Sequence, residues 1–234
     1  RLLATTGACT VANYTDSREG RHGQEHHIIG ALAVDVEDDG TYFIRQINAE
    51  KNGSFIDLDC KYTPNGVEKA PPALALTMGD IHVGKEEELV LKATKALCHL
   101  VRPQHLILHD VLDFHARNHH DAKSLKKAYE KFIKGKASVE EEVTMAINAV
   151  RIFSQWAKKT IIVRSNHDAA FDRWLEEADP HKDTANARYY FAVWNRLFEE
   201  QAATGKWPDA FSMEAKRLGV SNNVKFLTRN EEFS

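Results

Sequence analysis

The chain has 234 residues, which is enough for one large domain or for a compact domain with a smaller appendage. Hydrophobic residues make up 43% and charged residues 28%, the proportions of an ordinary soluble globular protein. The net charge of −3 excludes an overall positive field that attracts nucleic acid, although bound divalent cations would reverse the sign locally.

Membrane and disulfide signals are also missing from the sequence. No apolar run reaches the roughly 20 residues that a membrane span needs, and the sequence shows no signal-peptide pattern. The three cysteines are widely spaced and form no CxxC motif, so we expect a cytoplasmic protein without a disulfide framework or a thiolate zinc site. Because the chain begins with Arg1 rather than Met, we expect it to be part of a longer protein.

Residues 1–70 are predicted to form a small β meander of unknown role. Strands are expected at 27–36, 41–47 and 54–62, because these segments are rich in β-branched residues or alternate in hydrophobicity. Asp39-Gly40 between the first two segments favours a hairpin turn. The consecutive prolines Pro71-Pro72 indicate an extended connector, which predicts a domain boundary near residue 70.

Residues 71–234 are predicted to form a second domain in which strands and helices alternate. Short apolar runs predict strands at 73–78, 105–108, 160–163 and 224–227. Helical spacing of apolar residues predicts helices at 86–101, 122–134, 138–158, 169–179, 185–203 and 209–218. This order of elements is typical of an α/β fold in which helices flank a layered parallel sheet.

Three of the predicted strands each end in side chains that bind hard metal ions. Asp80 and His82 follow the first strand, Asp110 follows the second, and Asn166, His167 and Asp168 follow the third. Ligands of open α/β sheets bind at the carboxyl ends of the strands, so these distant segments are expected to meet in one crevice. Alternation along an extended segment would place Asp80 and His82 on the same side.

This set of side chains predicts a metal-dependent hydrolase. Carboxylate, imidazole and amide ligands without thiolate suit Mn²⁺, Fe or Zn²⁺. Asp110 could bridge two cations, which would clamp a phosphoryl group, and His167 is placed to protonate a leaving oxygen. The alternative is that each short motif is a chance loop sequence, and Asn166 or Asp168 could simply cap the following helix. Their joint occurrence at three strand ends favours the metal site.

The order D-x-H, then H-D, then S-N-H-D resembles that of the calcineurin-like metallophosphoesterases, which include phosphatases, cyclic-nucleotide diesterases and DNA-repair nucleases. The resemblance covers about residues 73–230. It implies that Asp80 and His82 hold a first metal, that Asp110 bridges, and that Asn166 holds a second. It also implies that His167 contacts the substrate and donates a proton with support from Asp168. Two divalent cations are therefore expected, with Mn²⁺ favoured and Fe, Zn²⁺ or Mg²⁺ as alternatives.

The chain departs from the pattern of that family in three ways. His109 and Ser165 stand where the family has glycines, which puts the geometry of both loops in question. The chain also lacks the family's later histidines, since no histidine follows His181. Either the chain is a fragment that stops before those ligands, which we favour, or it is a degenerate member of the family.

A narrower resemblance runs through most of the chain. The segments ATTGACTVANYT, YFIRQINAEKNGSFIDLD and HDVLDFHARNHH resemble tailed-phage pre-early DNA-transfer proteins, which are implicated in host-DNA degradation. This resemblance implies action in the cytoplasm of a bacterial host.

The segment that follows Asp110 is predicted to border the crevice and bind substrate. Arginine and asparagine side chains can hold phosphate oxygens, and arginine can do so with two parallel hydrogen bonds. The alternative is a polar loop that leads into a helix. The predicted substrate-binding residues are Asp113, His115, Arg117, Asn118 and His119.

Together these features predict a metal-dependent phosphodiesterase, specifically a phage DNA nuclease that uses a metal-bridging hydroxide as nucleophile. Two alternatives remain open. One is a phosphatase of small phosphomonoesters, and the other is a non-catalytic nucleic-acid-binding or assembly module on a degenerate phosphoesterase scaffold.

Overall fold

A computed structural model describes residues 4, 6–118, 121 and 124–227, and the predicted substrate residue His119 lies outside this set. The chain divides into two compact units, Arg1–Pro72 and Ala73–Ser234. None of the helices in the described ranges combines the length and the apolar character needed to cross a membrane.

The first unit is built from antiparallel strands, as predicted. β1 (Gly30–Val36) pairs with β2 (Tyr42–Asn48) in a hairpin, and the strands β3 (Phe55–Asp57), β4 (Cys60–Thr63) and β5 (Gly66–Lys69) form a separate antiparallel sheet. The prediction of one strand across 54–62 was wrong. A turn at Leu58, whose φ of 54° lies in the left-handed region, divides that segment into β3 and β4.

A helix in the first unit was missed in the sequence. α1 (Arg18–Glu25) is polar throughout, so it has no apolar periodicity that could reveal it. Its only sequence signal is the cap, because the Ser17 hydroxyl accepts a hydrogen bond from Gly20 N at 3.0 Å.

The second unit contains a parallel sheet with the strand order β6-β7-β8-β9. These strands span Ala75–Met78, His105–His109, Lys159–Val163 and Val224–Leu227. The helices of this unit are α2 (Glu88–Val101), α3 (Leu125–Ile133), α4 (Val139–Phe153), α5 (Ala169–Glu177), α6 (Thr184–Thr204) and α7 (Ala210–Arg217). The predicted α/β fold with a parallel sheet and flanking helices is confirmed.

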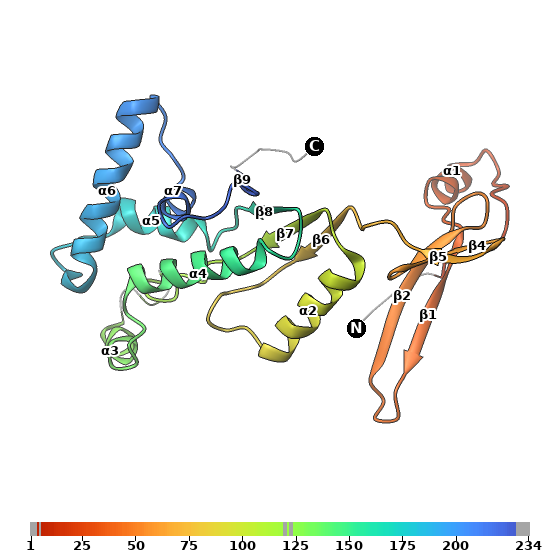
Figure 1. The fold of residues 1–234 in the computed structure, drawn as a ribbon, viewed down its shortest axis with the longest axis horizontal. Helices are drawn as coiled ribbons and strands as arrows, with labels where there is room; N and C mark the ends of the chain where they lie inside the picture. The colour runs from red at the N-terminus through yellow and green to blue at the C-terminus, as the bar shows by residue number, and fades with distance from the viewer. Residues whose placement is uncertain (1–3, 5, 119–120, 122–123, 228–234) are drawn as a thin grey trace. The chain divides into compact units, whose positions relative to one another are not determined.

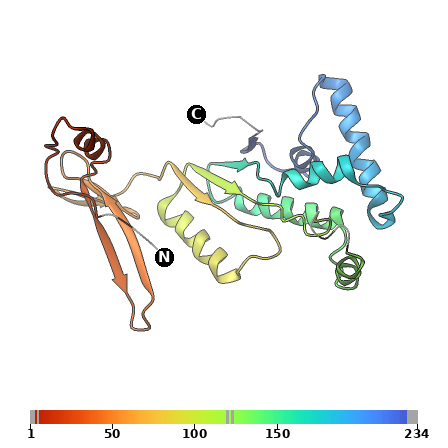
Figure 2. The ribbon, with the colours of Figure 1, turned by 180° about the vertical axis from the view of Figure 1, so that it is seen from behind.

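One part of the core of this unit lies between the sheet and α4, which runs alongside the parallel strands in both views (Figure 1, Figure 2), and another part is formed by α5, α6 and α7. Leu106 and Leu108 of β7 are completely buried and share this core with Val143, Ile147 and Val150 of α4. The predicted cap of α4 is present, since the Ser138 hydroxyl accepts a hydrogen bond from Glu141 N. The helix ends at Phe153 rather than at the predicted residue 158.

A half-buried carboxylate cluster joins α5 to the start of α7 and gives a pH-dependent prediction. Asp172 lies 2.6 Å from the Arg164 guanidinium and accepts a hydrogen bond from Ala210 N. Burial, reinforced by the nearby Asp209 carboxylate, raises the pKa of Asp172 to about 6. The folded protein therefore holds this proton more tightly than the unfolded chain does.

We expect the free energy of unfolding to fall as the pH rises from about 4 to 6, by at most about 1.4 kcal/mol per pH unit from Asp172. The sign follows because, as the pH rises, Asp172 loses its proton at a lower pH in the unfolded chain than in the folded protein. The raised pKa therefore stabilises the folded state at low pH, and this stabilisation is lost as the pH approaches 6. Asp172→Asn should flatten the dependence, which urea denaturation at several pH values would measure. Parallel pH profiles for the two proteins would contradict this assignment.

Candidate metal centre

Three loops at the carboxyl end of the parallel sheet carry the predicted ligands. Asp80 and His82 follow β6, Asp110 follows β7, and His167 follows β8. Because β6, β7 and β8 are parallel neighbours, these loops emerge at the same edge of the sheet. Main-chain hydrogen bonds join the first two loops, since His82 N donates to Asp110 O at 2.8 Å.

The backbone of these loops is unusual. Six non-glycine residues have positive φ in the described part of the chain, and Asp80, His82, Asp110 and Phe114 are four of them. Such conformations cost on the order of 1–3 kcal/mol each and occur frequently at functional sites. The prediction of an extended segment at 80–82 was wrong, because tertiary hydrogen bonds fold this segment into left-handed turns.

A first group of ligand atoms contains Asp80, His82 and Asp110. One atom from each of these residues lies within 4.8 Å of the other two, a spacing that could hold a metal ion. His82 Nε2 is 4.0 Å from Asp80 Oδ1. Asp80 is exposed, whereas the Asp110 side chain is almost completely buried.

Asp110 gives the strongest indication that this group suits a cation. Its Oδ2 lies 2.7 Å from His109 Nδ1, but its buried Oδ1 has no hydrogen-bond partner among the described residues. A buried, unpartnered carboxylate oxygen is unfavourable unless something positive faces it. A divalent cation held also by Asp80 and His82 would satisfy this oxygen.

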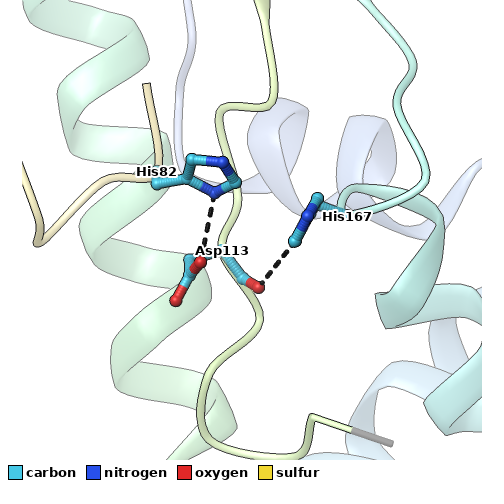
Figure 3. Close-up of side chains that lie close together, drawn as sticks. All are labelled: His82, Asp113 and His167. Carbon is cyan, nitrogen blue, oxygen red and sulfur yellow. Dashed lines mark hydrogen bonds and ion pairs between the residues drawn. The ribbon is translucent and has the colours of Figure 1, made fainter. Parts of the chain in front are cut away.

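A second group contains His82, Asp113 and His167, and it too meets the distance requirement for a metal ion. Asp113 contacts both imidazoles, whose ring centroids lie 4.6 Å apart in an edge-to-face arrangement (Figure 3). Its Oδ1 is 3.1 Å from His82 Nδ1, its main-chain oxygen is 3.2 Å from His167 Nδ1, and its Oδ2 is 2.7 Å from Lys85 Nζ. The lysine ammonium disfavours a second cation at this carboxylate.

These contacts indicate that Asp113 supports the site instead of binding a metal. An oxygen acceptor opposite Nδ1 favours the tautomer that carries its hydrogen there, which leaves the Nε2 lone pair available. His167, whose Nδ1 is hydrogen-bonded to the Asp113 main-chain oxygen, can therefore present Nε2 to a substrate. The contact of His82 Nδ1 with the Asp113 carboxylate is within ion-pair distance but is not a hydrogen bond. The sequence predicted Asp113 as a substrate-binding residue, but the structure places its carboxylate on His82 and Lys85.

Asp168 occupies a different position from the one expected. The prediction had it support His167, but its buried carboxylate accepts hydrogen bonds from Leu112 N at 3.0 Å and from Ser165 N and Oγ at 3.1 and 2.9 Å. Burial is the main cause that raises the pKa of Asp168. Asp168 therefore ties the loop after β7 to the loop after β8, and Asp113 orients the ring of His167.

We expect Asp168→Ala to lower the free energy of unfolding by about 2–5 kcal/mol, because it leaves two main-chain N–H groups buried without an acceptor. Asp168→Asn keeps one carbonyl acceptor and should lose less. Urea denaturation monitored by circular dichroism would measure both values. Equal stability of Asp168→Ala and the parent protein would show that these hydrogen bonds contribute nothing to the fold.

The remaining predicted site residues have other surroundings. Asn166 is exposed. Arg117 forms a bidentate ion pair with Asp183, through Nε at 2.6 Å and Nη2 at 2.5 Å. Arg117 and Asn118 line a cavity of about 390 Å³ that contains no residue of either group.

His115 lies closer to the candidate centre. It lines a cavity of about 380 Å³ together with Asp113 and Lys85. Burial, and then the positive charge of Lys131, lowers the pKa of His115. Its main-chain N–H donates to Glu142, whose carboxylate also accepts from Ala116 N at 2.7 Å and thereby fixes this loop.

Two contacts at the site carried no signal in the sequence. Lys85 and Glu142 reach the loops from a neighbouring turn and from α4, so nothing in their local sequence predicts the contact. His109 was noted only as a replacement for glycine, and its imidazole is the observed partner of Asp110 Oδ2.

No family model matches the sequence of this chain, and no solved structure matches it. Protein A1 of Escherichia phage T5 is 31% identical over 247 residues, an alignment that covers 100% of this chain and 44% of that protein. The chain thus spans less than half the length of this relative. The predicted resemblance to a phage protein is therefore confirmed. The chain also carries residue groups that could hold a metal ion. Its assignment to the metallophosphoesterases stays a prediction.

Proposed function

We propose that this chain provides the catalytic domain of a phage metal-dependent phosphodiesterase that hydrolyses DNA. The observation that carries the proposal is the Asp80, His82 and Asp110 group, in which a buried Asp110 oxygen faces no partner among the described residues. The likeness to a phage protein and the resemblance of the motif order to metallophosphoesterases support it. In this proposal residues 71–234 form the phosphoesterase domain, and residues 1–70 have a separate role.

The roles of the residues follow from their contacts. Asp80, His82 and Asp110 would hold one divalent cation, and Asn166 would contribute with Asp110 to a second, as the family resemblance implies. Such cations supply Lewis acidity and lower the pKa of water. His167, oriented by the Asp113 main-chain oxygen, would in its protonated imidazolium form donate the Nε2 proton to the leaving oxygen of the phosphodiester.

DNA is proposed as the substrate because the phage resemblance implies it, with the host cytoplasm as the place of action. Mn²⁺ is the favoured metal, and Fe, Zn²⁺ and Mg²⁺ are the alternatives that the same ligand set allows.

The test is metal-dependent cleavage of DNA by the longest natural form of the protein that contains this chain. Duplex and single-stranded DNA would be incubated with the metal-free protein and with added Mn²⁺, Mg²⁺ or Zn²⁺, and bound metal would be measured by mass spectrometry. We expect Mn²⁺ to bind and to restore cleavage that EDTA abolishes. Absence of both binding and cleavage would overturn the proposal and favour a non-catalytic scaffold, whereas activity only on nitrophenyl phosphate would favour a phosphomonoesterase.

A further inference from the structure

Lys85 lies beside the candidate metal centre, although no motif pointed to it. A turn places it there: Lys85 N donates to His82 O at 2.9 Å, and Gly84 adopts a φ of +97°, which side-chain-bearing residues rarely adopt. The turn directs the ammonium to Asp113, with Nζ 2.7 Å from Oδ2.

The ammonium of Lys85 is only partly used by this contact. An ammonium has three N–H donors, and Asp113 takes one of them. The Asp113 side chain is 8% exposed, whereas that of Lys85 is 58% exposed, so the lysine side chain remains open to an incoming group. The buried carboxylate thus holds a charged group at the edge of the site without enclosing it.

Lys85 lines two cavities. One, of about 480 Å³, is also lined by Asp80 and His82, and the other is the cavity of about 380 Å³ that Asp113 and His115 line. An anion bound beside the Asp80 and His82 ligands would therefore share a cavity with the lysine. Arg117, the cation that the sequence suggested for this purpose, is held by Asp183 and lines a different cavity.

On the basis of the function proposed above, we propose that Lys85 binds a non-bridging phosphate oxygen of the DNA at the metal centre, with Asp113 holding the ammonium in position. Lys85 is then a substrate-binding residue. The competing explanation is that Lys85 only neutralises the buried Asp113 charge. The two explanations differ in one measurable respect, because only a phosphate contact contributes to the salt dependence of DNA binding.

The experiment measures binding of a fluorescein-labelled phosphorothioate oligodeoxynucleotide by fluorescence anisotropy, in Mn²⁺ and at several NaCl concentrations. The parent protein is compared with Lys85→Gln and Lys85→Arg. Lys92→Gln serves as the matched control, because Lys92 is an exposed lysine whose ion pair with Glu88 lies on the surface of α2. Thermal unfolding of each variant establishes that it is folded.

We expect Lys85→Gln to raise the Kd roughly tenfold, as for the loss of a hydrogen bond to a charged group, and to reduce the slope of log K against log salt by about one. Lys85→Arg should restore the slope, and Lys92→Gln should match the parent protein. An unchanged slope and Kd in Lys85→Gln, or no DNA binding by the parent protein, overturns the inference. If Lys85→Gln does not fold, the double variant Lys85→Gln/Asp113→Asn decides, because it removes the two paired charges together. A slope lowered by about one supports the phosphate contact, and a slope like that of the parent opposes it.

Hydrolysis of bis(4-nitrophenyl) phosphate by the parent protein tests the proposed function separately. If the parent protein hydrolyses this compound in a metal-dependent way, and the salt dependence of DNA binding by Lys85→Gln equals that of the parent, the phosphodiesterase function is supported. In that case Lys85 does not bind the substrate. If the parent protein hydrolyses neither bis(4-nitrophenyl) phosphate nor DNA, the catalytic function is overturned. The anisotropy measurements of DNA binding would still decide whether Lys85 binds phosphate.

Discussion

Replacement of Asp110 with asparagine is expected to lower Mn²⁺-dependent DNA cleavage by at least about a hundredfold, the loss typical of removing one group that stabilises transition-state charge. Asparagine is the appropriate replacement because it has the same shape and tolerates the left-handed conformation that Asp110 adopts, with φ of 52°. The substitution therefore removes the negative charge opposite the proposed cation and leaves the loop conformation in place.

The same variant should also lose stabilisation by metal. A ligand that binds only the folded state raises the free energy of unfolding by RT ln(1 + [L]/Kd), which is about 2.7 kcal/mol at a hundredfold excess over Kd. We expect added Mn²⁺ to raise the Tm of the parent protein and to have little effect on Asp110→Asn. In the absence of metal the variant should be at least as stable as the parent, because it no longer buries an unpartnered charged oxygen.

The control for this experiment is Glu88→Gln, which removes the charge of an exposed carboxylate that pairs with Lys92 on the surface of α2. It should retain both cleavage and the response of Tm to Mn²⁺. If Asp110→Asn behaves like Glu88→Gln in both measurements, Asp110 is not a metal ligand and the proposed centre is wrong.

Replacement of Glu214 with alanine is expected to lower the free energy of unfolding by about 3–5 kcal/mol, the usual result of breaking a buried ion pair. Glu214 of α7 is completely buried. Its carboxylate lies 2.7 Å from Arg196 Nε and 2.8 Å from Arg217 Nη2, and it accepts a hydrogen bond from the Tyr189 hydroxyl. Alanine would leave the groups from α6 without their acceptor.

Two further variants show whether charge or shape matters at this position. Glu214→Gln keeps a carbonyl oxygen for Tyr189 and should lose less stability than Glu214→Ala. Glu199→Ala, which removes an exposed carboxylate of α6, should change the free energy of unfolding by no more than about 0.5 kcal/mol. Urea denaturation of all three measures the differences, and a loss below about 1 kcal/mol in Glu214→Ala would contradict a stabilising role for this cluster.

The positions of ligands at strand ends could be read from the sequence because they depend on local patterns. Short apolar runs predicted β6, β7 and β8, and hard-ligand residues follow each run at Asp80, Asp110 and His167. The rule that parallel strands bring their carboxyl ends to one edge then sufficed to predict that these loops meet. The coarse fold and the location of the candidate centre therefore needed no tertiary information.

The internal arrangement of the centre could not be predicted in this way. Asp113 was expected at the substrate and Asp168 behind His167. Instead, the Asp113 main-chain oxygen faces Nδ1 of His167, and the Asp168 carboxylate accepts a hydrogen bond from Leu112 N, so both contacts join different loops. Arg117 was expected at the crevice, and its partner Asp183 is 66 residues distant in sequence. No periodicity or spacing reports such pairs.

The sequence by itself determined the strand and helix order of Ala73–Leu227 and the edge of the sheet where the ligands gather, because hydrophobic periodicity is a local property of the chain. Only the tertiary structure decided the left-handed turns at Asp80, His82 and Asp110, the supporting position of Asp113 and the place of Lys85. The physical reason is that these features depend on hydrogen bonds and ion pairs between loops distant in sequence, whose combined energy overrides the preference of each residue for its ordinary backbone conformation.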